Sequence, residues 1–199
     1  MFSKLNLRFG RALKMKEFLE TILPQERLTE FLSIGQILKL EKGEYYIRAG
    51  EVPTKLGFTI SGLFRYVYVN QEGREFTKGI ILENQFLSSY SGMISQNPSY
   101  FFIEALEGSE VYSFSYKKWN DLLKTHPFWT QFLLEVIEKA FSKKEKRERD
   151  LLLLHAETRY LDFLKEYPNL DKRVNQTIIA SYLGIQPESL SRIRKKLGT

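Results

Sequence analysis

The most constraining feature of the sequence is its C-terminal segment, residues 176–199, which has the pattern of two short helices joined by a tight turn. The apolar face of the first helix consists of Ile179, Ala180 and Leu183. Gly184 follows and suits a turn that needs a positive φ angle. Pro187 suits the first turn of the second helix, because it has no N–H to donate. The apolar face of that helix consists of Leu190, Ile193 and Leu197.

The outward face of the second predicted helix is mainly basic. It carries Glu188, Ser191, Arg192 and Lys195, and Arg194 and Lys196 complete the basic group. Such a pair of helices is typical of a helix-turn-helix, whose second helix enters the major groove of DNA. An ordinary helical hairpin with a solvated basic face is the alternative. The apolar spacing, the turn glycine, the proline and the charges together favour DNA binding.

The charge of the chain supports an anionic partner. The 199 residues carry a formal net charge of +6, and residues 171–199 contain four more basic than acidic residues. Because there is no cysteine, disulfides, zinc–thiolate sites and iron–sulfur clusters held by thiolates are excluded. The two histidines, His126 and His155, are not spaced as metal ligands. We therefore expect no metal site.

Several classes of protein do not fit the sequence. No run of about eighteen apolar residues is present, so we expect no transmembrane helix and no membrane partner. The first residues have interspersed charges instead of an apolar core, so we expect no secretory signal and a cytoplasmic location. No nucleophile–histidine arrangement or phosphate-binding loop is visible. The sequence therefore predicts a protein that is not an enzyme.

The pattern of the rest of the chain predicts a β-rich region between helices. Helical apolar spacing covers residues 15–32, where Pro24 should interrupt it, and returns at 116–123 and 157–166. Residues 34–114 alternate short β-branched and aromatic runs with glycine turns. Such runs, spaced about 8–12 residues apart, predict an antiparallel barrel or sandwich.

A long helix is predicted from residue 128 to about residue 154. Its length of about 40 Å exceeds what a small domain needs, and its apolar stripe is close to heptad spacing, which favours pairing with a second copy. A helix lying along the barrel is the alternative. We interpret the charge run 143–150 as a solvated stretch. The residues expected at the dimer interface are Trp129, Leu133, Val136, Ile137 and Ala140.

This order of elements resembles the Crp/Fnr family of bacterial transcription regulators. Its most specific stretches are 42–51, 60–65 and 174–197. The resemblance implies an α+β fold, with an N-terminal antiparallel β-roll (jelly roll) flanked by helices, a long dimerisation helix and a helix-turn-helix domain. We expect no full trailing wing, because the sequence ends two residues after Leu197.

The resemblance also implies a domain organisation. Residues 1–126 would form an effector-type domain like the cyclic nucleotide-binding domains, residues 127–154 the dimerisation helix, and residues 155–199 the helix-turn-helix domain. The role of residues 1–14 is left open.

The function implied by the resemblance is sequence-specific transcription regulation. A homodimer would bind double-stranded DNA at a palindromic operator, with RNA polymerase as a further candidate partner. Glu188 and Arg192 match the family's base-reading acid and arginine, and their chemistry suits cytosine N4 and guanine O6/N7. Residues expected to contact phosphates, or to lie near them, are Asn175, Thr177, Ser189, Ser191, Lys195 and Lys196.

The expected effector site departs from the family pattern. Members that bind cyclic nucleotides carry Gly-Glu and Arg-Ser pairs, where this chain has Ser88-Ser89 and Ser99-Tyr100. No arginine or lysine lies between Lys78 and Lys117, so a buried phosphate would lack charge-assisted hydrogen bonds. We therefore expect no cyclic nucleotide and no other cofactor. Ser88, Ser89, Ser99 and Tyr100 stay candidates for the pocket of an unidentified effector, and the neighbouring aromatic residues are either pocket or core.

An alternative function belongs to a different class. The β-roll would bind a small molecule, and the C-terminal helices would contact a protein partner. The basic excess at 192–196 argues against this alternative.

Overall fold

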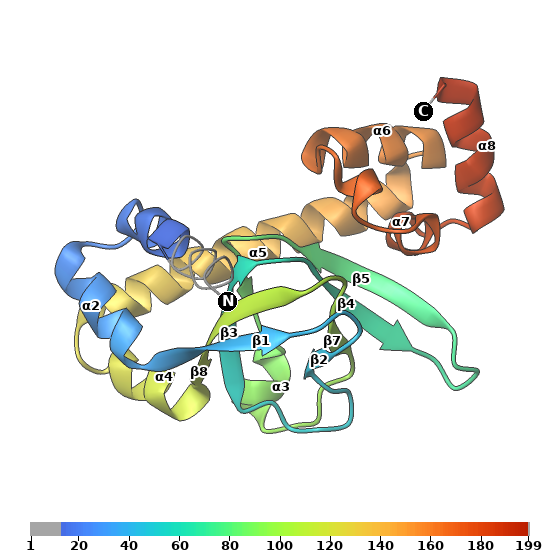
Figure 1. The fold of residues 1–199 in the computed structure, drawn as a ribbon. Coiled ribbons are helices and arrows are strands. Elements are labelled where there is room, and N and C mark those ends of the chain that lie inside the picture. Colours follow the sequence, from blue (N-terminus) through green and yellow to red (C-terminus); the bar gives the residue numbers. More distant parts are fainter. Residues whose placement is uncertain (1–12, 199) are drawn as a thin grey trace, which may run out of the picture. The chain divides into compact units, whose positions relative to one another are not determined.

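A computed structural model describes residues 13–198, which divide into two compact units (Figure 1). The first unit comprises the described residues up to Tyr68 together with Ile80–Gln131. The second comprises Val69–Gly79 and the described residues from Phe132 onward. The tip of one β-hairpin therefore groups with the C-terminal helices, an arrangement that the sequence does not indicate.

The strands form two four-stranded sheets with strand orders β1-β8-β3-β6 and β2-β7-β4-β5, and of β5 only Ile80 and Ile81 belong to the first unit. The strands are β1 (Gly35–Leu40), β2 (Tyr45–Ile47), β3 (Lys55–Ser61), β4 (Phe64–Val69), β5 (Glu75–Ile81), β6 (Phe86–Leu87), β7 (Phe102–Ala105) and β8 (Ser109–Ser115). The pairings of β8 with β1 and β3, of β3 with β6, and of β7 with β2 and β4 are antiparallel. The predicted antiparallel β-roll is confirmed.

Strand β4 shows why these residues form a two-faced sheet. Phe64 and Tyr66 alternate with Arg65 and pack against the apolar cluster of the roll, because successive side chains of a strand point to opposite faces. Arg65 lies opposite Glu104 of β7, and its Nε donates to that carboxylate at 2.6 Å. The buried cluster consists of Leu40, Tyr46, Ile47, Phe64, Ile81, Leu87, Phe101, Ile103, Ala105 and Val111.

Aromatic side chains from some helices of the first unit form a cluster. Residues 13–20 are helical and are followed by α2 (Gln25–Ser33), α3 (Tyr90–Ser95) and α4 (Tyr116–Leu123). The break predicted at Pro24 is present. Phe31 of α2 contacts both Trp119 and Trp129, and the Trp129 indole donates to Glu30 at 2.9 Å. Trp129 is 0% exposed, so its side chain is not available to a second copy, and its prediction as a dimer residue needs correction.

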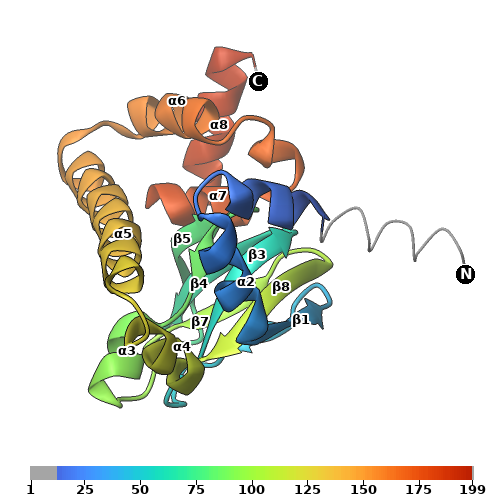
Figure 2. The same cartoon turned by 90° about the vertical axis from the view of Figure 1, so that its left-hand side faces the viewer.

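The second unit is helical apart from the hairpin tip. It contains most of α5 (Pro127–Leu153), then α6 (Ala156–Glu166), the short 3-10 helix η1 (Leu170–Lys172), α7 (Gln176–Leu183) and α8 (Pro187–Leu197). Figure 2 shows α6, α7 and α8 grouped together. Their core includes Tyr160, Phe163, Tyr167, Ile179, Ala180, Leu183 and Leu190. None of the helices among residues 13–198 combines the length and apolarity needed to cross a bilayer.

Candidate nucleic-acid interface

Helix α7 begins and ends where the sequence predicts. The Asn175 side chain accepts a hydrogen bond from the Ile178 N–H at 2.9 Å, which caps the first turn. At the other end Gly184 adopts a φ of 68°, and the Ile185 N–H donates to the Ala180 carbonyl at 3.0 Å. This left-handed glycine stop satisfies the last carbonyls of the helix and turns the chain towards α8.

Helix α8 presents the two predicted base-reading residues to solvent. Pro187 occupies its first turn, and Leu190 is fully buried. Glu188 and Arg192 are exposed, one helical turn apart, and neither forms an ion pair with any described residue. A guanidinium and a carboxylate held this way keep their hydrogen-bonding groups available for base edges.

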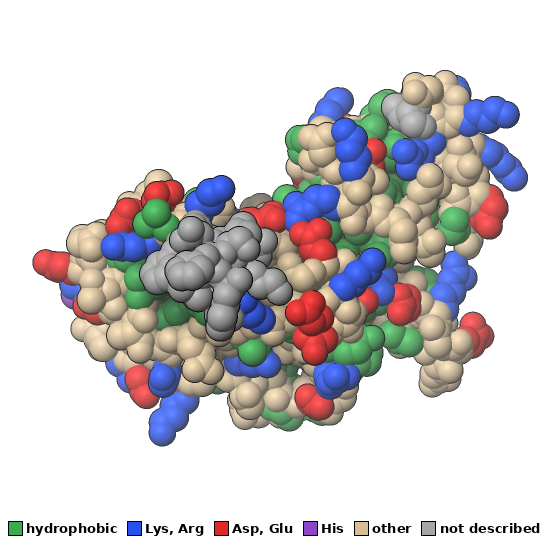
Figure 3. Space-filling view, viewed as in Figure 1, with side chains coloured by type: hydrophobic (Ala, Val, Ile, Leu, Met, Phe, Trp, Pro, Cys, Tyr) green, Lys and Arg blue, Asp and Glu red, His purple; other side chains and the backbone are tan. Residues whose placement is uncertain are grey.

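The predicted phosphate contacts have different surroundings. Asn175 uses its carbonyl oxygen as the helix cap, so its amide N–H groups remain to donate. Lys196 is paired with Glu157 at 2.7 Å, which makes it a weaker candidate. Thr177, Ser191 and Lys195 are exposed, and Ser189 is half-buried. Figure 3 shows Lys and Arg side chains projecting from the C-terminal helices.

Two arginines that the sequence analysis did not single out fix the end of α7. Arg147 of α5 donates to the Tyr182 carbonyl at 2.7 Å and to the Thr77 carbonyl at 3.2 Å. Arg159 of α6 donates to the Leu183 carbonyl at 3.0 Å. Cations at the C-terminus of a helix satisfy its free carbonyls and suit its dipole. The hairpin tip adds a bond from the Thr77 N–H to the Ser181 hydroxyl at 2.8 Å.

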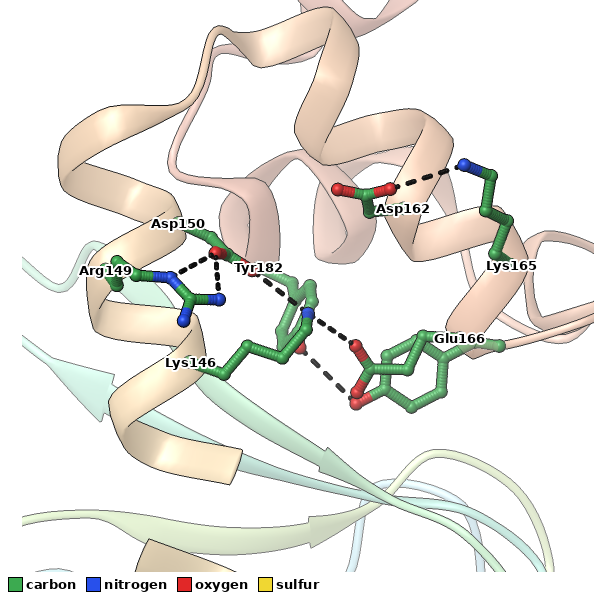
Figure 4. Close-up of polar contacts among 8 residues, drawn as sticks. Lys146, Arg149, Asp150, Asp162, Lys165, Glu166 and Tyr182 are labelled. Atoms are coloured by element: carbon green, nitrogen blue, oxygen red, sulfur yellow. Dashed lines mark hydrogen bonds and ion pairs between the residues drawn. The ribbon is translucent and has the colours of Figure 1, made fainter. Parts of the chain in front are cut away.

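An ion-pair network formed by residues next to Arg147 in the sequence joins α5 to α6 (Figure 4). The Lys146 ammonium lies 3.0 Å from Asp150 and 3.2 Å from Glu166. Partial desolvation acts to raise the pKa of Asp150, but hydrogen bonds from Lys146 and Arg149 lower it overall. The pKa of Lys146 is raised, first by its hydrogen bond to Asp150. These contacts fix α6 against α5 and so support the helix-turn-helix.

Replacing Gly184 by alanine is expected to destabilise the second unit by about 1–2 kcal/mol, because a residue with a Cβ is strained at positive φ. The new Cβ would also lie 3.0 Å from the Leu151 side chain. Gly198 is the matched control, since its φ is 72° and a Cβ added there would meet no atom within 4 Å. Denaturant unfolding should show the larger loss for Gly184→Ala. Equal losses at both positions would contradict the packing argument.

The predicted effector residues do not share one environment. Ser89 and Ser99 are buried, and the Ser99 hydroxyl donates to the Phe101 carbonyl at 2.7 Å. Ser88 is half-buried, and its N–H donates to the Tyr66 hydroxyl at 3.4 Å. Tyr100 is 85% exposed. An effector pocket at these residues stays a prediction.

Helix α5 exposes an apolar stripe to solvent. Leu134, Ile137 and Phe141 are spaced three and four residues apart and are 47%, 39% and 62% exposed. Of the predicted dimer residues, Ile137 and Ala140 are exposed, whereas Leu133 and Val136 are half-buried. The stripe therefore includes Leu134 and Phe141, which are not among the residues expected at the dimer interface. An exposed apolar stripe at this spacing is the kind of face that a second helix covers.

Comparisons with known proteins bear on the domain and the fold. Residues 37–126 match the family model of the cyclic nucleotide-binding domain. No curated protein matches the sequence.

Solved structures resemble nearly the whole chain. The c-di-GMP-responsive global regulator CLP of Xanthomonas campestris is similar at 19% identity and a TM-score of 0.72, over 88% of this chain and 92% of that chain. FixK2 from Bradyrhizobium japonicum is similar at 18% identity and a TM-score of 0.71, over 83% and 85%. A Eubacterium rectale protein described as a Crp/Fnr-family regulator is similar at 16% identity and a TM-score of 0.68, over 90% and 86%. At these identities the likeness shows the fold.

Proposed function

We propose that this chain, which has the fold of the Crp/Fnr-type transcription regulators, binds double-stranded DNA as a homodimer and regulates transcription. Each copy inserts α8 into the major groove of one half of a palindromic operator. Glu188 and Arg192 read base edges. RNA polymerase bound near the operator is a further candidate partner.

The exposed pair on α8 is the observation that carries this proposal. Leu190 anchors the helix in the core, while Glu188 and Arg192 lie in solvent without ion-pair partners among the described residues. Arg147 and Arg159 hold the preceding helix at its last carbonyls. A rigidly supported helix with free recognition groups is what direct readout of bases requires.

We infer that the regulator does not depend on a cyclic nucleotide. The matched domain covers residues 37–126, but no arginine or lysine lies between Lys78 and Lys117 to neutralise a phosphate. Ser99, at the position expected for the clamping cation, instead donates its hydroxyl to the Phe101 carbonyl. A buried phosphate there would lose its hydration without gaining charge-assisted hydrogen bonds.

Selection of bound sequences from a pool of random DNA duplexes, without added nucleotide, tests the proposed function. We expect a two-fold symmetric sequence with half-sites about 10–10.5 base pairs apart, or a multiple of that distance. Adding cyclic AMP or cyclic GMP should leave the affinity for the selected duplex unchanged. If no sequence is enriched, the proposal that the chain reads DNA bases is wrong. If binding requires a cyclic nucleotide, the proposed independence from cyclic nucleotides is wrong.

A further inference from the structure

The charged run of α5 divides into two sets by its contacts. Lys146, Arg149 and Asp150 form ion pairs within their own chain, on the side of α5 that meets α6 (Figure 4). Arg147 bonds to backbone carbonyls, and the Lys143 ammonium lies 5.1 Å from the centre of the Tyr167 ring. By contrast, Lys144, Glu145 and Glu148 are exposed and form no ion pair or hydrogen bond with any described residue. The run is therefore not uniformly a solvated stretch.

The three residues of the second set continue the exposed apolar stripe. They follow Phe141 by three, four and seven residues, and Leu152, which is also exposed, follows Glu148 by four. Residues at these spacings lie on one face of a helix. A charged segment thus interrupts an apolar stripe between Phe141 and Leu152.

Heptad geometry places these charges where two parallel helices meet. With Leu134 and Phe141 at a positions, Glu148 takes the next a position, Lys144 a d position and Glu145 an e position. A d side chain enters a hole formed by four residues of the facing helix. For Lys144 that hole would contain Phe141, Lys144, Glu145 and Glu148 of the partner subunit.

We propose that Lys144, Glu145 and Glu148 form an intersubunit charge cluster that sets the register of a parallel homodimer. This inference rests on the proposed homodimer and names the contacts that align its two α5 helices. The Lys144 ammonium pairs with Glu145 and Glu148 of the partner subunit, and the two-fold axis repeats both pairs. The stripe of one chain therefore packs against the same stripe of a second copy of the chain.

The balance of charges supports a second copy of the chain as the binding partner of the stripe. Lys78 of the hairpin tip interacts with Lys144, and its pKa is lowered to about 8, first by burial and then by that like charge. Carboxylates from a second copy would relieve this excess of positive charge. When Lys78 is counted with the three residues of the cluster, each chain contributes two lysines and two glutamates, and their formal charges balance. A shift of one heptad would place Lys144 and Glu148 against apolar side chains, which is unfavourable. Polar groups at core positions specify the register of a coiled coil because they disfavour such shifted pairings.

A charge-swap experiment tests the proposal. Lys144→Glu makes the segment wholly acidic, and Glu145→Lys with Glu148→Lys makes it wholly basic. Each variant alone should form a homodimer at least about tenfold weaker than the wild type, because attractive pairs become repulsive on both sides of the axis. An equimolar mixture of the two should form heterodimers at least as stable as the wild-type dimer. Since the chain has no cysteine, Lys42→Cys allows donor and acceptor labelling, and energy transfer reports pairing.

Lys139→Glu is the matched control, because Lys139 is exposed on the same helix away from the stripe. Reversing this charge should change the dissociation constant of the dimer by no more than about twofold. Circular dichroism shows whether each variant is folded. A monomeric wild-type protein would contradict the proposed homodimer itself. A wild-type dimer that Lys144→Glu does not weaken, or variants that fail to pair when mixed, would overturn the charge cluster and leave the homodimer standing.

Discussion

Replacing Arg192 by alanine is expected to weaken binding to the selected duplex by about 5- to 150-fold for each half-site, and to relax the base preference at the position it reads. A good arginine–guanine pair contributes about 1–3 kcal/mol of discrimination. Arg192 is exposed and lies one turn after the exposed Glu188, so its loss leaves the core of the helix intact. Titrations with the selected duplex and with single-base variants of it measure both effects.

Lys195→Ala separates base reading from general attraction to DNA. Lys195 lies on the same helix and is also exposed, but we expect it to contact phosphate. Its loss should weaken binding to all sequences alike and reduce the salt dependence by about one phosphate contact. If Arg192→Ala behaves in this same uniform way, Arg192 does not read a base.

Replacing Phe141 by aspartate is expected to convert the dimer into monomers at micromolar concentrations and to abolish operator binding. Phe141 is 62% exposed in the single chain, so burial against a second copy would gain roughly 1.5–3 kcal/mol for a fully covered side chain. Two charges placed in an apolar seam add a desolvation cost to that loss. We expect the dissociation constant to rise by at least about 100-fold in sedimentation equilibrium.

Leu153→Asp serves as the control for this change. Leu153 is 73% exposed on the same helix but lies off the stripe, so its substitution should leave dimerisation nearly unchanged. A Phe141→Asp protein that still forms dimers as tightly as the wild type would show that the stripe is not the interface.

The helix-turn-helix was predictable because local chemistry determines it. Gly184 ends α7 with a φ of 68°, and Pro187 begins α8, and both requirements belong to single residues. Strand boundaries likewise follow glycine turns such as Gly43, Gly62 and Gly73, each with a positive φ. Such signals need no knowledge of distant contacts.

The features that the sequence did not reveal depend on tertiary contacts. A heptad pattern identifies an apolar side chain but not the surface that buries it. The pattern therefore predicts Trp129 at the dimer interface, whereas Phe31 and Trp119 pack against it within its own chain. The Thr77 N–H of the hairpin tip donates to the Ser181 hydroxyl of α7, and the Thr77 carbonyl accepts from Arg147 of α5. A pattern of side chains does not indicate such backbone contacts. In the sequence, Arg147 is one of several charged residues in the run 143–150, and only its hydrogen bonds to the Tyr182 and Thr77 carbonyls distinguish it.

The proposed function requires that two copies of α8 read the two halves of one operator. The most direct measurement is an anisotropy titration, at about 150 mM salt, of the selected duplex and of the same duplex with one half-site scrambled. We predict two chains bound per intact duplex and an affinity at least about 100-fold lower after scrambling, because two linked contacts bind far more tightly than one. One chain per duplex, or equal affinity for both duplexes, would contradict binding as a dimer to two half-sites.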